Sequence, residues 1–225
     1  MTQEDTAVTQ FEAPSLARLR PALGGVPAYV AGKPAQPIEG LTTYKLSSNE
    51  NPYPPLPSVR EAIAEAAASV NRYPDMNNVA LKDAIAAFHG FAPENVAVGP
   101  GSTGVLVQLV QALCDPGDEV VFAWRSFEAY PIIVRLAGAT PVMVPLTASG
   151  EHDLDAMAAA ITERTKLVFV CTPNNPTGTI VTDAAARSFL AKVPADVVVV
   201  IDEAYVEFVR DPDAVPSFAL QRESP

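Results

Sequence analysis

Residues that can bind an anion or hold a charge gather in short loops, each of which follows an apolar run of the sequence. The loops read Gly-Pro-Gly-Ser-Thr-Gly at residues 99–104, Trp-Arg-Ser-Phe-Glu at 124–128, Thr-Pro-Asn-Asn-Pro-Thr-Gly at 172–178 and Asp-Glu-Ala-Tyr at 202–205. Glycine-rich backbone suits a phosphate, an aromatic ring can stack on a flat ligand, and a buried carboxylate can face a cation. Together the loops predict a site for a phosphorylated, aromatic and protonatable ligand.

The glycine-rich loop at residues 99–104 has three interpretations. It matches the G-x-G-x-x-G pattern of dinucleotide sites, but those sites also place an acid at the end of the next strand, where this sequence has Trp124. A smaller phosphate fits better, because Gly101, Ser102 and Thr103 would present unpaired amides at the start of a helix. An ordinary helix cap would explain the same residues.

The other loops also admit purely structural explanations. Asparagine, proline and glycine at residues 172–178 are common in turns, and Phe127 could be a core residue. Asp202 could cap a helix, but a carboxylate that directly follows a buried strand needs a cation or strong donors. The combination of loops, rather than any one of them, favours a ligand site.

These loops require a scaffold that brings them to one edge. Apolar runs predict strands at residues 96–98, 119–124, 140–144, 166–171 and 197–201. Helical patterns occur at residues 57–70, 79–88, 104–114, 127–137, 154–162 and 183–192. Asp153 and Thr182 are expected to cap the last two helices, and the last two strands are expected to be central. This alternation predicts an α/β fold, a mostly parallel sheet with helices on both faces and with its ligand site beyond the carboxyl ends of the strands.

Composition and charge narrow the classes of function. The 225 residues are 48% hydrophobic and 18% charged, so the chain can bury a core. A formal net charge of −11 disfavours nucleic acid and anionic membranes as partners. Two cysteines and two histidines offer neither a disulfide framework nor a metal site, and we find neither a secretory signal nor a membrane-spanning run. We therefore expect a cytoplasmic protein without a metal ion.

The motifs identify the chain as similar to the class-II, fold-type I aminotransferases, in particular the histidinol-phosphate and aromatic amino acid aminotransferase group. They are, in family order, residues 48–53 (Ser-Asn-Glu-Asn-Pro-Tyr), 71–75 (Asn-Arg-Tyr-Pro-Asp), 101–103, 173–178 and 202–205. Residues 49–58 and 124–130 look most like the actinobacterial branch that acts on aromatic amino acids such as phenylalanine.

The resemblance implies an activity, a cofactor and partners. The cofactor would be pyridoxal 5′-phosphate, the amino donor an aromatic amino acid and the acceptor a 2-oxo acid, 2-oxoglutarate; the full-length protein would be a homodimer. Histidinol phosphate stays open as the donor, because both donors present a flat ring. A non-catalytic, truncated module that binds cofactor or dimerises is a second alternative, and a nucleotide-binding dehydrogenase domain is a third.

The resemblance also assigns roles around the cofactor ring. Asp202 would face the pyridine nitrogen and hold it protonated, so that the ring can accept electrons. Asn175 and Tyr205 would hydrogen-bond the phenolic oxygen. Phe127 stands where relatives often carry a tyrosine that stacks on the ring, and stacking would survive this difference.

Further roles concern the phosphate and the substrate. Gly101, Ser102 and Thr103 would bind the phosphate of the cofactor. Tyr73 would reach the phosphate in the neighbouring subunit, which is why a homodimer is expected. Tyr29 would close over the substrate.

One expected feature of the family has no counterpart in this sequence. The lysine that forms a Schiff base with the cofactor should follow Tyr205 by a few tens of residues, yet no lysine follows Tyr205. The lysines of the chain are Lys33, Lys45, Lys82, Lys166 and Lys192. None matches the family motif, and the substrate-clamping arginine and the small C-terminal domain are also missing. We therefore expect a C-terminally truncated chain, catalytically incomplete alone, with an N-terminal arm at residues 1–45 and an incomplete cofactor-binding domain at residues 46–225.

Overall fold

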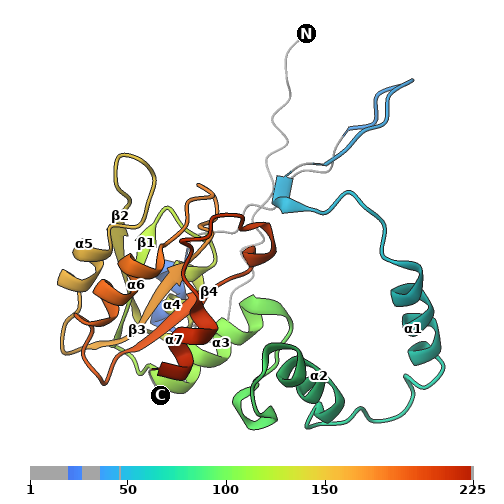
Figure 1. Cartoon of the computed structure of the whole chain (residues 1–225), viewed down its shortest axis with the longest axis horizontal. Coiled ribbons are helices and arrows are strands. Elements are labelled where there is room, and N and C mark those ends of the chain that lie inside the picture. Colours follow the sequence, from blue (N-terminus) through green and yellow to red (C-terminus); the bar gives the residue numbers. More distant parts are fainter. Residues whose placement is uncertain (1–19, 27–35, 46, 224–225) are drawn as a thin grey trace, which may run out of the picture. The chain divides into compact units, whose positions relative to one another are not determined.

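The structure is a computed structural model and describes residues 20–26, 36–45 and 47–223 (Figure 1). The chain divides into two compact units, which are described separately below. The sheet unit comprises Met1–Val26 and Leu106–Pro225, and the two-helix unit comprises Pro27–Val105.

A four-stranded sheet forms the centre of the sheet unit. Its strands are β1 (Glu119–Trp124), β2 (Thr140–Pro145), β3 (Thr165–Cys171) and β4 (Val198–Asp202). They lie in the order β2-β1-β3-β4, and every neighbouring pair is parallel. The register places Cys171 opposite Asp202, so the last residues of β3 and β4 lie side by side. The predicted parallel α/β architecture is therefore confirmed.

Helices connect the strands and cover both faces of this sheet. They are α3 (Gly101–Leu113), α4 (Tyr130–Ala137), α5 (Leu154–Ala159), α6 (Asp183–Leu190) and α7 (Ser217–Glu223). Both expected N-caps are confirmed: Asp153 accepts a hydrogen bond from the amide of Ala156 at 2.9 Å, and Thr182 accepts one from the amide of Ala185 at 3.3 Å. Each cap satisfies an amide that the first helical turn leaves unpaired. Shorter 3₁₀ turns occur at η1 (Pro21–Gly25) and η4 (Val206–Phe208).

The core consists of two apolar clusters, one on each face of the sheet. Val121 and Val168 face α5, α6 and α7, whereas Val120 and Leu167 face α3 and α4. Successive side chains of a strand point to opposite faces, and both faces are covered here. This explains why β1 and β3 are apolar at consecutive positions instead of alternating with polar residues.

The strand order reverses between β1 and β3. The chain leaves β1 through α4 toward β2, and it leaves β3 through α6 toward β4, on the other side of the sheet and the other face. In open parallel sheets the ligand crevice forms where the order reverses, beyond the carboxyl ends of the strands. The loops that follow Trp124 and Cys171 flank this position.

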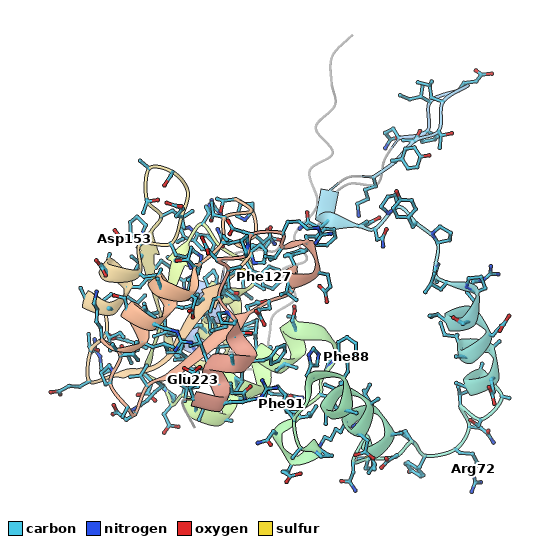
Figure 2. All side chains as sticks on the ribbon, viewed as in Figure 1. Arg72, Phe88, Phe91, Phe127, Asp153 and Glu223 are labelled. Carbon is cyan, nitrogen blue, oxygen red and sulfur yellow. The ribbon has the colours of Figure 1, made fainter. Side chains whose placement is uncertain are left out.

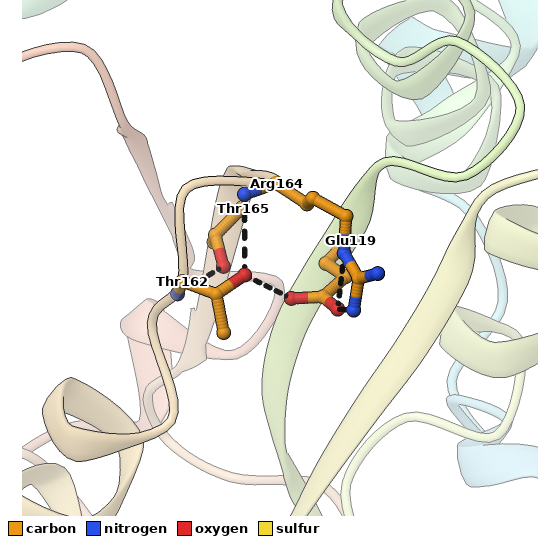
Figure 3. A network of polar contacts seen from close by, with 4 residues as sticks. All are labelled: Glu119, Thr162, Arg164 and Thr165. Atoms are coloured by element: carbon orange, nitrogen blue, oxygen red, sulfur yellow. Dashed lines mark hydrogen bonds and ion pairs between the residues drawn. The ribbon is translucent and has the colours of Figure 1, made fainter.

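A network of polar contacts closes the opposite, amino edge of the sheet (Figure 3). The buried Glu119 carboxylate accepts hydrogen bonds from Thr162 Oγ1 at 2.6 Å, Arg164 Nε at 3.1 Å and Arg164 Nη2 at 2.5 Å. The hydroxyl of Thr162 and the Arg164 guanidinium hold the pKa of Glu119 below its ordinary value. The ionised carboxylate therefore fastens the start of β1 to the loop that precedes β3.

The two-helix unit contains η2 (Ser47–Asn49), α1 (Pro57–Ala67), α2 (Val79–His89) and η3 (Pro93–Asn95), together with the first turn of α3. Helix α1 has no buried residue, and in α2 only Ala86 is buried. The large apolar residues of α1 are exposed; Ile63, for example, is 62% exposed. Most helical stability in proteins comes from packing of an apolar face, and no residue of α1 is buried within the part of the chain that the structure describes.

Several expectations about the elements were wrong, among them one end each of α1, α3 and α5, which differ by three residues from the expected ends. Residues 96–98 form no strand, because so short a run gains too little from pairing to form a strand without a neighbouring ladder. Strand β4 is an edge strand within the described residues, with Val198 43% exposed, and is not central. Helix α4 begins at Tyr130 instead of residue 127, because Pro131 favours a helix start and leaves Phe127 in the preceding loop.

Candidate active site

Asp202 is the last residue of β4 and lies at the carboxyl edge of the sheet. Its side chain is buried, and residue Asp202 is 9% exposed. Carboxylate Oδ2 accepts a hydrogen bond from the hydroxyl of Tyr130 at 2.7 Å, and Oδ1 accepts one from the amide of Ala204 at 3.1 Å. Both donors are neutral, and Asp202 makes no ion pair within the part of the chain that the structure describes. A buried carboxylate of this kind is suited to a protonated ligand nitrogen.

Tyr130, the first residue of α4, was not singled out by sequence reasoning. Its side chain is fully buried, and its ring packs against Phe122, Phe127 and Phe169 at centroid distances of 5.5, 5.6 and 4.9 Å. Burial, reinforced by the neighbouring Cys171 and Asp202, raises the pKa of the Tyr130 hydroxyl. The hydroxyl therefore stays protonated and donates to Asp202.

Phe127 lies in the loop between β1 and α4 and is labelled in Figure 2. The ring meets Tyr130 edge-on, with an interplanar angle of 90°. The side chain is half-buried and packs against the apolar cluster that contains Tyr130. It is thus anchored to the core while part of it remains accessible, which a platform for a ligand ring requires.

The loop after β3 is tied to the loop after β1 by Asn174, which is 2% exposed. Its Oδ1 accepts a hydrogen bond from Ser126 Oγ at 2.7 Å, and its Nδ2 donates to the carbonyl of Arg125 at 3.1 Å and to Thr177 Oγ1 at 2.9 Å. These bonds bridge the two loops beside the point where the strand order reverses. The predicted site residue Asn175 is only half-buried, so Asn174 holds the loop and Asn175 remains available to a ligand.

Two further titratable side chains lie inside this edge. Cys171 is buried, its thiol donates to the carbonyl of Pro173 at 3.5 Å, and burial raises its pKa. A neutral, buried thiol is a packing residue and not a nucleophile. Both ring nitrogens of His152 are buried without a hydrogen-bond partner, and burial lowers the pKa of His152 although the neighbouring Asn174 side chain opposes this.

Tyr205 follows β4 in the turn that precedes η4 and is half-buried. Because β3 and β4 are adjacent and parallel, Asn175 and Tyr205 follow them at the same edge of the sheet. The neighbouring Glu203 accepts a hydrogen bond from Ser217 Oγ at 2.6 Å, which ties this turn to the start of α7. The sheet unit therefore brings Phe127, Asn175, Asp202 and Tyr205 to one edge.

The residues predicted to bind phosphate belong to the two-helix unit. Gly101, Ser102 and Thr103 form the exposed first turn of α3, and Gly101 has φ +70°. A Cβ atom at Gly104 would lie 2.5 Å from Cδ of Pro100, so the last glycine of the motif is required by contact with Pro100. The phosphate role itself stays a prediction.

The two tyrosines named from the sequence also stay predictions. Tyr73, in the two-helix unit, is 98% exposed. Tyr29 lies outside the described residues, as does Lys33. An almost fully exposed tyrosine is compatible with a role toward a second chain but does not test it.

The lysines that the structure describes lie away from the carboxyl edge or in the other unit. In the sheet unit, Lys166 is the second residue of β3, at its amino end, and Lys192 follows α6 and pairs with Asp155 at 2.6 Å. Lys45 and Lys82 belong to the two-helix unit. The described part of the sheet unit thus places no lysine next to Asp202.

The described residues contain neither a metal-binding cluster nor a membrane-spanning helix. No cluster of three or more histidine, cysteine, aspartate or glutamate side chains is arranged to bind a metal ion. None of the described helices has both the length and the apolar character needed to cross a bilayer.

Comparisons with known proteins give a consistent picture. The model of the family "Aminotransferase class I and II" matches residues 42–224. An aromatic amino acid aminotransferase of Streptomyces avermitilis is 56% identical over 208 residues, which make up 92% of this chain and 58% of that protein. The corresponding protein of Corynebacterium diphtheriae is also 56% identical, over 92% of this chain and 59% of its own length.

Solved structures agree with these relatives. The histidinol-phosphate aminotransferase from Sinorhizobium meliloti, solved in complex with pyridoxal-5′-phosphate, superposes with a TM-score of 0.70 and 33% identity. The match covers 75% of this chain and 46% of that one. The chain thus spans less than two thirds of the length of these relatives.

Proposed function

Because the chain belongs to the class I and II aminotransferase family, we propose that it forms part of an enzyme that transfers the amino group of an aromatic amino acid to a 2-oxo acid. The acceptor is 2-oxoglutarate and the cofactor is pyridoxal 5′-phosphate. One observation carries the proposal: Asp202 is a buried carboxylate with neutral donors and no ion pair within the described residues, at the carboxyl edge of a parallel sheet. A carboxylate in these surroundings suits a protonated ring nitrogen.

The residues of the site have separable tasks. When bound, pyridoxal 5′-phosphate supplies the electron sink that makes the α-proton of an amino acid acidic. Asp202 accepts a hydrogen bond from the ring nitrogen and holds the proton there; a charge-assisted bond of this kind contributes about 1.5–3 kcal/mol. Phe127 covers one ring face, at about 0.5–1.5 kcal/mol beyond burial. Asn175 and Tyr205 donate hydrogen bonds to the phenolic oxygen.

The phosphate and the second chain complete the proposal. Gly101, Ser102 and Thr103 bind the cofactor phosphate through helix N-terminal amides, and Tyr29 covers the substrate. The exposed apolar residues of the two-helix unit pack against a second copy, to which Tyr73 contributes. The protein is accordingly a homodimer. Light scattering after size exclusion tests this, since a monomer at micromolar concentration would contradict it.

The domain boundaries and location follow the same reasoning. Residues 46–225 form much of the cofactor-binding domain, preceded by an arm at residues 1–45; the family match from residue 42 supports this division. The reaction takes place in the cytoplasm, which suits the free cysteines Cys114 and Cys171.

Turnover by the product of the complete gene tests the main proposal. Phenylalanine and 2-oxoglutarate should yield glutamate in a reaction that requires added pyridoxal 5′-phosphate. No turnover with phenylalanine, tyrosine or tryptophan would contradict the proposal. Histidinol phosphate is the alternative donor, supported by the Sinorhizobium meliloti relative, and a higher kcat/KM for it in direct competition would favour that activity.

A non-catalytic role for the 225-residue chain alone is supported by the absence of a lysine from the carboxyl edge in the described sheet unit. Borohydride reduction of the chain with pyridoxal 5′-phosphate, followed by peptide mass spectrometry, tests this role. We expect no stoichiometric label on any lysine. One cofactor bound per chain to Lys166 or Lys192 would rule the role out.

A further inference from the structure

The hydrogen bond between Tyr130 and Asp202 links the start of α4 to the end of β4, and none of the site roles implied by the family resemblance includes Tyr130. We propose that Tyr130 is a positioning residue that fixes the Asp202 carboxylate and keeps a shared proton on the ligand nitrogen. The inference deepens the proposed function and rests on it. Its basis is the 2.7 Å bond from the Tyr130 hydroxyl to Asp202 Oδ2, made between residues 72 positions apart in the chain.

The two donors to Asp202 differ in what they can fix. The Ala204 amide, two residues along the chain, reaches Oδ1 through a local turn. A carboxylate rotates easily about its last side-chain torsion, so this one bond leaves the plane of the group poorly defined. The Tyr130 hydroxyl holds the second oxygen from another element, and the two bonds together fix the direction in which the remaining lone pairs point.

Tyr130 can hold this position because its ring is enclosed by the core. It is fully buried and in contact with Phe122 on β1 and Phe169 on β3. The same ring meets Phe127 edge-on at 5.6 Å. One side chain therefore supports the two groups proposed to hold the ligand ring, the carboxylate at its nitrogen and the aromatic platform at its face.

The Tyr130 hydroxyl is a neutral donor, and this affects where the proton shared by Asp202 and the ligand nitrogen lies. An arginine beside Asp202 would neutralise the carboxylate, whereas a hydroxyl orients it and leaves its charge for the ligand. Hydrogen bonds to an ionised carboxylate also stabilise that form against protonation. Removal of the hydroxyl should thus shift the shared proton away from the ligand nitrogen and toward Asp202.

Pyridoxamine 5′-phosphate labelled with ¹⁵N in its ring tests the inference, because this probe needs no lysine. The ¹⁵N chemical shift of the probe bound to the full chain reports whether its nitrogen is protonated. In Tyr130→Phe, which keeps the ring and its packing, we expect the pH midpoint of deprotonation to fall by about one unit, a tenfold change. Tyr44→Phe, an exposed tyrosine in the two-helix unit, is the matched control and should leave the midpoint unchanged.

The outcomes separate this inference from the proposed function. If the wild-type chain binds the probe, Asp202→Asn changes the ¹⁵N shift and Tyr130→Phe does not, the positioning role is wrong while the site stands. If Asp202→Asn also leaves the shift unchanged, the proposed function fails. Tyr130→His retains a ring donor, so its pH midpoint should lie between those of Tyr130→Phe and the wild type. A midpoint equal to that of Tyr130→Phe would contradict the role.

A measurement on the wild-type chain covers the case in which the variants do not fold. The Tyr130 hydroxyl proton should be visible by NMR in the presence of the probe, because it is buried and hydrogen-bonded. Slow exchange with solvent supports the role. Exchange as fast as that of the exposed Tyr44 hydroxyl overturns it.

Discussion

The sheet buries a carboxylate at each of its two edges, and the two groups have opposite surroundings. At the amino edge, Glu119 binds the Arg164 guanidinium and the Thr162 hydroxyl. At the carboxyl edge, Asp202 binds a tyrosine hydroxyl and a backbone amide. The first charge is compensated within the protein, whereas the second has no positive partner among the described residues. The charge of the donors, more than burial, thus distinguishes the structural carboxylate Glu119 from Asp202, the carboxylate proposed to bind a ligand.

Among the substitutions at the two edges of the sheet, Asp202→Asn should have the largest effect on turnover. The amide cannot hold a proton on the ring nitrogen, so turnover by the complete protein should fall about 100-fold or more. The free energy of unfolding should change much less, because Asn keeps the volume and its Oδ1 can still accept one of the two hydrogen bonds that Asp202 accepts. Steady-state kinetics and urea unfolding measure both quantities, and turnover within threefold of wild type would contradict the assignment.

Asn174 and Asn175 allow a second comparison, between a structural and a proposed ligand-binding side chain in the loop after β3. Asn174→Ala removes the partner of Ser126 and of the Arg125 carbonyl, and should lower the free energy of unfolding by about 2–3 kcal/mol. Asn175→Ala should change it by less than about 1 kcal/mol and weaken binding of pyridoxamine 5′-phosphate. The reverse pattern in urea unfolding and equilibrium dialysis would show that the two roles are exchanged.

Glu119→Gln should act on stability alone. Because Arg164 remains well solvated at 69% exposure, we expect a loss of about 1–2 kcal/mol, less than for a fully buried pair. Glu207→Gln, an exposed carboxylate, is the control and should stay within about 0.5 kcal/mol. A change in the affinity for pyridoxamine 5′-phosphate in Glu119→Gln would break the proposed distinction between the edges.

The lowered pKa of Glu119 fixes how its contribution to the free energy of unfolding depends on pH. The folded-state pKa of Glu119 in the wild type lies below the ordinary value of 4.5, so the folded state binds fewer protons in that range than the unfolded state. The stabilisation by Glu119 should be complete above about pH 4.5 and disappear as the pH falls through the folded-state pKa. Unfolding free energies of wild type and Glu119→Gln should therefore converge in acid, and a constant difference would contradict the assignment.

His152 should give the smallest effect. Burial lowers its pKa from the ordinary value of 6.5, so the unfolded state binds more protons below about pH 6.5 and acid destabilises the fold. His152→Gln should remove this loss of stability, at most about 1 kcal/mol, between pH 6.5 and 5. A pH profile of unfolding that is the same in His152→Gln and in the wild type would contradict the role of burial.

The fold was largely predictable, because its signals are local. Consecutive apolar residues predicted β1 and β3, and Asp153 and Thr182 predicted helix starts, since caps and periodicity involve residues a few positions apart. The edge position of β4 could not be predicted, because a run of valines does not reveal how many neighbours the strand has. The short run at residues 96–98 carried too little sequence to distinguish a strand from a loop.

The sequence predicted which loops lie at the carboxyl edge of the sheet, but not the contacts that support them. Asp202, Asn175 and Phe127 follow from motifs, whereas the partner of Asp202 is 72 residues away and leaves no local signal. The helix predicted over residues 127–137 contains Tyr130, but nothing in its spacing points to Asp202. The Asn-Asn pair is ambiguous in sequence, because only the backbone path decides which amide turns inward.

The contact between Gly104 and Pro100 has a consequence for comparing distant sequences. Alanine at Gly104 would collide with the proline ring, whereas alanine at Gly101 would meet no atom but would have to adopt a left-handed backbone. A change at Pro100 could therefore release Gly104 from its constraint during evolution, while Gly101 would stay fixed. Homologues that keep only the first of these two glycines can retain the same turn, and a search that demands both would miss them.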